Sequence, residues 1–179
     1  MPDGRSTYDS RTREPTRMKL IKNGILVEDH FETIADDAPL PPNGTIVSLA
    51  RFHNDREALL ARNAPLGVRL KSDESPEALV EDVHRLSVVV LEFPKFRDGR
   101  AFSWARMLRT RLDFKGEIRA VGHFLYDQHA FMHRVGIDAF EIQDNITVEE
   151  YHRALGEMTD VYQPSADRRK TIWQLRAGA

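Results

Sequence analysis

The most apolar segment of the chain, residues 86–92 (Leu-Ser-Val-Val-Val-Leu-Glu), limits what this sequence can fold into. A continuous run of aliphatic residues, without the alternation of a half-exposed strand, is typical of a strand buried on both faces of a parallel sheet. Parallel neighbours need crossover connections, which are usually helices. The segment therefore predicts an α/β domain with this strand near the centre of its sheet.

Four further segments have strand character, and helical patterns separate them. These predicted strands cover residues 45–49, 66–70, 117–121 and 139–142. Five strand–helix repeats at this spacing predict parallel strands joined by right-handed crossovers. A closed barrel of eight repeats needs about 250 residues, whereas this chain has 179. We therefore expect an open, doubly wound sheet of about five parallel strands, with a partial barrel as the alternative.

Cap residues place the helices between these strands. Asn54 is a good N-cap for the first helix, and Ser75-Pro76 begins the second with a cap residue followed by proline. The other helices are predicted over residues 101–112, over residues 126–135 and from Thr147, with Glu150 completing a capping box.

The two ends of the chain differ from the middle. Residues 1–17 are polar and lack an apolar core, which predicts a disordered leader rather than a signal peptide, and whether Met1 or Met18 is the functional start is left open. Residues 18–163 form the predicted single α/β domain, preceded by a β-hairpin whose Asn23-Gly24 pair suits a type I′ turn. Residues 164–179 form a tail, and its segment 171–175 is expected to dock on the domain or on a second subunit, so that a homodimer remains open.

Composition excludes several classes of protein. The chain has no cysteine, so it cannot use a disulfide framework, a thiol nucleophile or a cysteine-ligated metal. Its 26 basic and 28 acidic residues give a net charge of −2, which provides no general attraction to nucleic acid or anionic lipid. No apolar run approaches the roughly 20 residues of a membrane span. We expect a cytoplasmic protein with neither a nucleic-acid nor a membrane partner.

The loop after the central strand, residues 93–103, is the first candidate site. Ligands of parallel α/β sheets bind at the carboxyl ends of strands, where this loop must lie. Its cations and the N–H groups at the start of the next helix would suit a sulfite-, sulfate- or phosphate-like group. The alternative is a tight turn in which Asp98 pairs with Arg100 and Gly99 supplies a positive φ. The candidate ligand-binding residues here are Lys95, Asp98, Gly99, Arg100 and Ser103.

The loop after the strand at residues 117–121 is the second candidate and should neighbour the first. It contributes Gly122, Asp127 and Gln128. Asp127 either caps the following helix or orients a ligand. The amide of Gln128 can both donate and accept a hydrogen bond to a ligand.

Other chemistry-bearing residues give weaker signals. His129 and His133 lie four apart on one helical face, as in zinc enzymes, but no third ligand is spaced to complete a site, so we expect a surface or half-buried pair and no metal. No phosphate-binding glycine motif is present, so no cofactor is expected. The basic residues between Arg97 and Arg119 form either a solvated helix face or a docking surface for an acidic partner. Glu92 and Glu141 could converge as a carboxylate pair.

Three blocks of the chain carry a family resemblance. They are Phe93-Pro94-Lys95-Phe96 with Asp98-Gly99-Arg100 and Ser103; residues 115–122; and Asp127-Gln128 leading into residues 136–141. These blocks resemble the bacterial domain-of-unknown-function family 934, and with the N-terminal hairpin the resemblance extends over residues 18–175. The chain departs from the family at His123-Phe124, where members often have small or aliphatic residues.

The resemblance implies an oxidoreductase role in sulfite reduction, because members are typically encoded beside assimilatory sulfite reductase and sulfonucleotide reductase. It supplies no catalytic residues. The leading hypothesis is therefore an accessory to sulfite reduction that binds a small oxyanion or a reductase partner through the strand-end loops. The alternative is a stand-alone enzyme for a small anionic substrate, with Glu92, Lys95 and Asp98 as acid/base and orienting groups.

Overall fold

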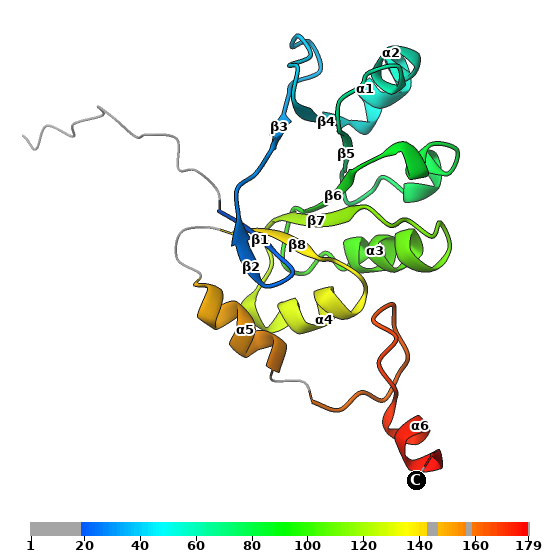
Figure 1. Cartoon of the computed structure of the whole chain (residues 1–179). Helices are drawn as coiled ribbons and strands as arrows, with labels where there is room; N and C mark the ends of the chain where they lie inside the picture. Colours follow the sequence, from blue (N-terminus) through cyan, green and yellow to red (C-terminus); the bar gives the residue numbers. More distant parts are fainter. Residues whose placement is uncertain (1–18, 143–146, 157–158, 179) are drawn as a thin grey trace, which may run out of the picture.

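The computed structural model describes residues 19–142, 147–156 and 159–178 (Figure 1). Its strands form one eight-stranded sheet in the order β2-β1-β8-β7-β6-β5-β4-β3. The strands are β1 (Lys19–Lys22), β2 (Ile25–Val27), β3 (Phe31–Thr33), β4 (Gly44–Ser48), β5 (Leu66–Leu70), β6 (Val88–Phe93), β7 (Glu117–Gly122) and β8 (Ala139–Ile142). The helices are α1 (Leu49–Asn54), α2 (Arg56–Leu60), α3 (Arg100–Thr110), α4 (His129–Arg134), α5 (Val148–Gly156) and α6 (Ile172–Ala177), with short 3₁₀ turns η1 (Pro76–Leu79), η2 (Val83–Arg85) and η3 (Tyr126–Gln128).

The sheet is wound in one direction only. Strands β3 to β8 are parallel, and each pairs with the next strand in the chain, so the strand order never reverses. Right-handed crossovers that all run the same way place their helices on one side of the sheet. Figure 1 shows α1 to α5 along the outer side of the curved sheet. The result is a half-barrel, so the expected doubly wound sheet is wrong and the partial-barrel alternative is confirmed.

The N-terminal hairpin is part of this sheet and does not merely precede it. Strand β1 pairs antiparallel with both β2 and β8, which makes the sheet mixed. The predicted turn is confirmed, with φ of 50° at Asn23 and 80° at Gly24. Strand β3 was not predicted; with β1 and β2 it raises the sheet from about five strands to eight.

The two edge strands of the sheet are neighbours in the chain. Strands β2 and β3 lie at opposite ends of the strand order, yet only residues 28–30 separate them. The chain therefore crosses from one edge of the half-barrel to the other. We call residues 25–33 the strap; Figure 1 shows it on the side of the sheet away from the helices.

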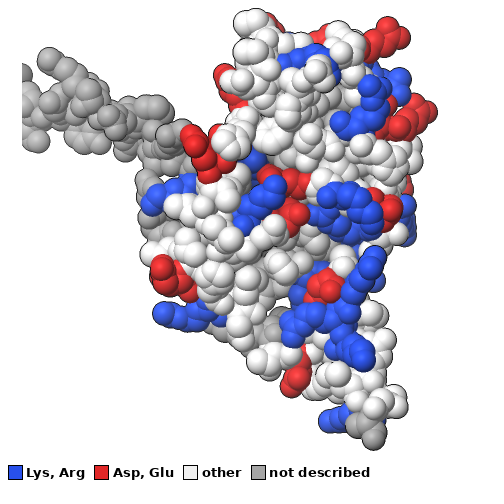
Figure 2. Space-filling model, in the orientation of Figure 1, with Lys and Arg blue, Asp and Glu red and all other residues white. Residues whose placement is uncertain are grey.

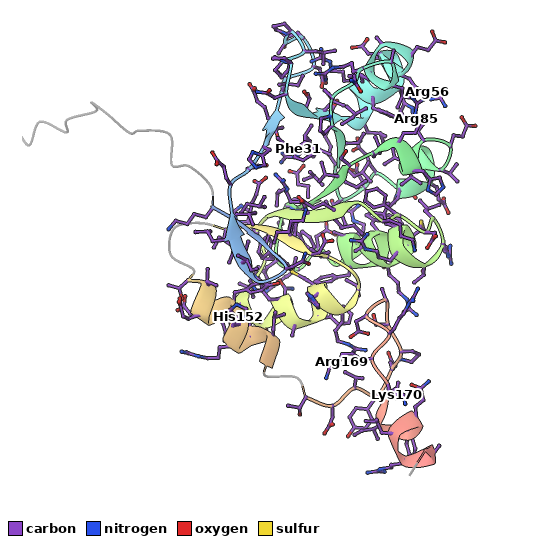
Figure 3. All side chains as sticks on the ribbon, viewed as in Figure 1. Phe31, Arg56, Arg85, His152, Arg169 and Lys170 are labelled. Atoms are coloured by element: carbon purple, nitrogen blue, oxygen red, sulfur yellow. The ribbon has the colours of Figure 1, made fainter. Side chains whose placement is uncertain are left out.

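The two faces of the sheet are packed differently. The outer face and the helices share the main core, which includes Phe93 and Phe140. On the inner face only a small apolar cluster forms, from Ile46, Val88, Val90 and Val121. Phe31 of the strap packs against this cluster, and Figure 3 shows it between the strap and the sheet.

Arg119 lies at the centre of the inner face and joins it to the strap. Its side chain is 1% exposed, and its two Nη atoms donate to the carboxylate of Asp29 at 2.6 and 3.0 Å. Its Nε donates to Glu117 at 2.8 Å, and Nη1 also approaches Glu141 at 3.4 Å. Burial alone would lower the pKa of Arg119, but the hydrogen bond to Asp29 and the charge of Glu117 raise it above its ordinary value. Arg119 therefore stays charged and holds the strap.

A second arginine, Arg109, holds together the loops that precede β7 and β8. Arg109 of α3 donates to the backbone carbonyls of Phe114, Gly116 and Gly136 and pairs with Asp138 at 2.9 Å. The interpretation of the basic residues 97–119 as a uniformly solvated or docking face is therefore wrong for Arg109 and Arg119. Both are structural, and on the face seen in Figure 2 positive and negative side chains are interspersed.

Several helix boundaries differ from those predicted. Ser48 caps α1 by accepting the N–H of Arg51, and Asn54 is the last residue of that helix rather than the N-cap of another. Ser75 caps as predicted, but only the 3₁₀ turns η1 and η2 follow it. The capping box of Thr147 and Glu150 is confirmed.

The C-terminal arm, residues 159–178, contacts the domain through its first part. Arg134 pairs with Asp167 at 3.1 Å and donates to the carbonyl of Gln163. Thr171 is buried, whereas Trp173 is 65% exposed. The N–H of Ile172 donates to the carbonyl of Val161 at 2.8 Å within the arm, and docking of the segment 171–175 on the domain stays a prediction. None of the helices that the structure describes is long and apolar enough to cross a membrane.

We predict that Asp29→Asn lowers the free energy of unfolding by about 3 kcal/mol, because it removes the main counter-charge of a buried guanidinium. The measurement is urea denaturation at neutral pH. The matched control is Asp113→Asn, which breaks the exposed pair with Lys115 and should leave the free energy of unfolding nearly unchanged, because solvent screens such a pair. Equal effects of the two substitutions would contradict the role given to the strap.

Candidate functional site

A pocket of about 680 Å³ opens at the carboxyl ends of β6, β7 and β8. This is the edge of the sheet at which parallel α/β proteins bind their ligands. Two loops and one strand end form it. The lining residues are Pro94, Lys95, Phe96, Arg97, Gly122, His123, Phe124, Leu125, Glu141 and Ile142.

Backbone and amide hydrogen bonds fix the two loops against each other. The side chain of Gln128 accepts the N–H of Leu125 at 2.9 Å and donates to the carbonyl of Phe96 at 3.1 Å. The N–H of His123 donates to the carbonyl of Phe93 at 2.7 Å. Gly122 has φ of 102°, and a Cβ there would collide with the Phe93 carbonyl, so this close approach requires glycine.

One wall of the pocket is the edge of an aromatic cluster. Phe124 lines the pocket and makes edge-to-face contacts with Phe93, Phe140 and His129 at centroid distances of 5.4 to 6.0 Å. Such contacts are the preferred arrangement of buried rings. Phe96 and Leu125 line the pocket as well and are about half exposed, at 45% and 47%. The pocket is therefore mainly apolar.

The charged residues that line the pocket differ in how exposed they are. Lys95, Arg97 and His123 are exposed, whereas Glu141 is only 22% exposed in its side chain and pairs with Arg119. Burial raises the pKa of Glu141, although the neighbouring Arg119 opposes this rise. The pocket thus has positive groups at its mouth and one carboxylate at its inner end.

The structure brings some of the predicted site residues together. Lys95 and Gly122 line the pocket, and Gln128 holds its two loops in place. Ser103 is an exposed residue of α3 and does not line it. Asp127 is the second residue of η3, which begins after Leu125, so its expected role as an N-cap is wrong.

The sequence 98–100 forms the tight turn that was the alternative prediction. Arg100 donates to both carboxylate oxygens of Asp98, at 2.7 and 3.0 Å, and to the hydroxyl of Ser72 at 2.9 Å. These contacts lower the pKa of Asp98, chiefly through the hydrogen bond from Arg100. Gly99 has φ of −86°, so the positive φ expected there is wrong. None of these three residues lines the pocket.

The carboxylates considered for acid/base chemistry are each held by an arginine. Glu92 lies 3.5 Å from Arg69, and Glu141 pairs with Arg119. Of the proposed set Glu92, Lys95 and Asp98, only Lys95 lines the pocket.

His129 and His133 do not form the expected surface or half-buried pair. His133 is exposed, but His129 is fully buried, with Nδ1 3.0 Å from the carbonyl of Tyr126 and, among the described residues, no hydrogen-bond partner for Nε2. Burial lowers the pKa of His129. Within residues 19–142, 147–156 and 159–178, no group of three histidine or acidic side chains could hold a metal ion.

Several pocket residues were missed by sequence reasoning. Arg97, Phe124 and Ile142 line the pocket but were not among the candidates. Two of them could have been found from their position: Arg97 lies in the first predicted strand-end loop, and Phe124 lies two residues after Gly122 in the second. Nothing local marks Ile142.

Fold and site together define an α/β half-barrel protein with a strand-end pocket of the size that binds small molecules. The family model described as "Bacterial protein of unknown function (DUF934)" matches residues 67–173, more than half of the chain. The chain therefore belongs to this family, and the resemblance stated from the sequence is confirmed. Searches of curated proteins and of solved structures each returned no match.

We predict that the buried His129 makes the fold sensitive to acid. Its pKa is lower in the folded protein than the value of about 6.5 expected for an unfolded chain. The unfolded state therefore binds more protons in this range, so the free energy of unfolding should fall as pH decreases from 7.5 to 5.5.

The test compares this decrease in the wild type and in His129→Phe by urea denaturation at both pH values. Phenylalanine keeps a ring against Phe124 and Tyr151 but cannot titrate. The variant should lose less stability on acidification than the wild type. An identical loss in both proteins would show that His129 does not couple folding to pH.

Proposed function

We propose that this protein binds a small anion in the strand-end pocket and acts as a cytoplasmic accessory to assimilatory sulfite reduction. The observation that carries the first part is the gathering of Lys95, Arg97 and His123 around one apolar pocket. In the part of the chain that the structure describes, none of the three forms a salt bridge; Arg97 only lies over the ring of Phe96, at 5.3 Å. An anion would supply the missing counter-charge.

The surroundings strengthen such an interaction. Apolar walls exclude water, and a charge pair beside them is screened less than one in open solvent. An arginine fork and a lysine ammonium are the groups that proteins use most to hold oxyanions. Gln128 ties the loop that carries Lys95 and Arg97 to the loop that carries His123, so the three groups project from one fixed scaffold.

The metabolic context comes from the family resemblance alone. Family members are encoded beside sulfite reductase and sulfonucleotide reductase, which makes a reductase the partner to test. We favour an accessory over a stand-alone enzyme because Glu92 and Asp98 lie outside the pocket lining and are engaged by Arg69 and Arg100.

We predict that isothermal titration at low ionic strength detects binding of phosphate, sulfate or sulfite, and that Lys95→Gln with Arg97→Gln weakens it at least about tenfold. Binding to the wild type should also weaken as salt is added. The control is Arg106→Gln with Arg111→Gln, which removes the same charge from exposed positions outside the pocket lining.

Retention of full affinity in the Lys95/Arg97 variant, or the same loss in the Arg106/Arg111 variant, would overturn the assignment of the pocket.

The accessory role is tested separately with immobilised protein and purified sulfite reductase. Capture of the reductase supports that role, and failure of capture overturns it while leaving the anion site in place.

A further inference from the structure

We propose that the natural ligand is an organic anion built on a flat ring system, with an amino or N–H donor at the end away from its anionic group. This inference rests on the proposed function and deepens it, because it names the class of molecule that the strand-end pocket accepts. Three features of the pocket support it: its size, its apolar walls and the order of its charges.

The size of the pocket exceeds that of a bare oxyanion. Cavities of about 300–1,000 Å³ are typical of sites that enclose an organic molecule, and this one measures about 680 Å³. A sulfite or phosphate ion bound by the cations at the mouth would leave most of that space unfilled. The body of the ligand must therefore extend inward from its anionic group.

The walls suit a flat apolar body. Phe96 and Phe124 present rings from the two loops, and Leu125 and Ile142 complete an apolar lining between them. Aromatic side chains contact other rings favourably in stacked or edge-to-face geometry. Phe96 and Leu125 are also about half exposed and line the same pocket, and exposed apolar side chains that gather in one place mark binding sites.

The charges orient the ligand. Exposed cations surround the mouth, so the anionic group belongs there. At the inner end Glu141 would repel a second negative group, and an ionised carboxylate can only accept hydrogen bonds. Its Oε1 faces Arg119 at 3.4 Å, and within the described residues Oε2 has no hydrogen-bond donor. That oxygen is therefore available to a donor on the ligand.

The test uses four probes that share a phosphate group: adenosine 5′-monophosphate, purine riboside 5′-monophosphate, ribose 5-phosphate and inorganic phosphate. The first carries ring and amino group, the second only the ring, and the last two neither. Isothermal titration should show adenosine monophosphate binding about tenfold more tightly than purine riboside monophosphate, and that probe more tightly than ribose 5-phosphate.

The matched variants are Glu141→Gln and Glu92→Gln. Glu141→Gln should clearly reduce the preference for the amino-bearing ring, since a neutral amide oxygen is a weaker acceptor than a carboxylate, while phosphate binding shows that the site remains folded. Glu92→Gln changes the acidic residue of the neighbouring strand β6, outside the pocket lining, and should keep the preference.

The outcomes separate the two levels of the proposal. Equal affinity for all four probes would overturn the ligand class but leave an anion site. A preference for the amino-bearing ring that is undiminished in Glu141→Gln would overturn the orientation and with it this inference. Binding of none of the probes would overturn the proposed function itself.

Discussion

The ion pair between Arg119 and Asp29 is the interaction on which the rest of the structure depends. A half-barrel leaves its inner face open and its two edge strands unpaired, and here the strap crosses that face. A guanidinium with five donors can engage several carboxylates at once, and Arg119 engages Asp29 of the strap, Glu117 of its own strand and Glu141 of β8. Phe31 then adds an apolar contact beside it, with the guanidinium over its ring at 5.8 Å.

The same network links the inner face of the sheet to the pocket. Glu141 belongs to both, since it pairs with Arg119 on the inner face and lines the inner end of the pocket. Its position is set by β8, which is held between β7 and the N-terminal hairpin. The strap therefore stabilises more than the edge strands: it maintains the charge environment in which the pocket carboxylate sits.

Local signals explain which parts of the fold could be predicted. Asn23-Gly24, the aliphatic run before Phe93 and the Thr147 capping box each act through neighbouring residues, and all three are confirmed. The direction of winding is a property of strand order, which no local pattern encodes, and a three-residue strand such as β3 carries too little periodicity to be seen.

For the site as for the fold, local sequence patterns predict position along the chain but not three-dimensional arrangement. The loops were placed at the correct strand ends because every parallel strand directs its carboxyl end to one edge, but which cation faces the pocket depends on loop geometry. Arg100 is engaged by Asp98 and Ser72, and Arg97 lines the pocket instead. In β7 the charged residues Glu117 and Arg119 alternate with apolar ones, which indicates that one face of this strand is charged. From the sequence, Arg119 instead counts among the residues of a basic surface.

Hydrogen exchange measured by mass spectrometry on the wild type and on Asp29→Asn tests the role of Arg119 most directly. If the ion pair holds the strap, exchange in residues 25–33 rises in the variant far more than exchange in β6, because the strap opens without global unfolding. If exchange rises by the same factor in both segments, the substitution has only lowered global stability, and the strap is not held by this pair.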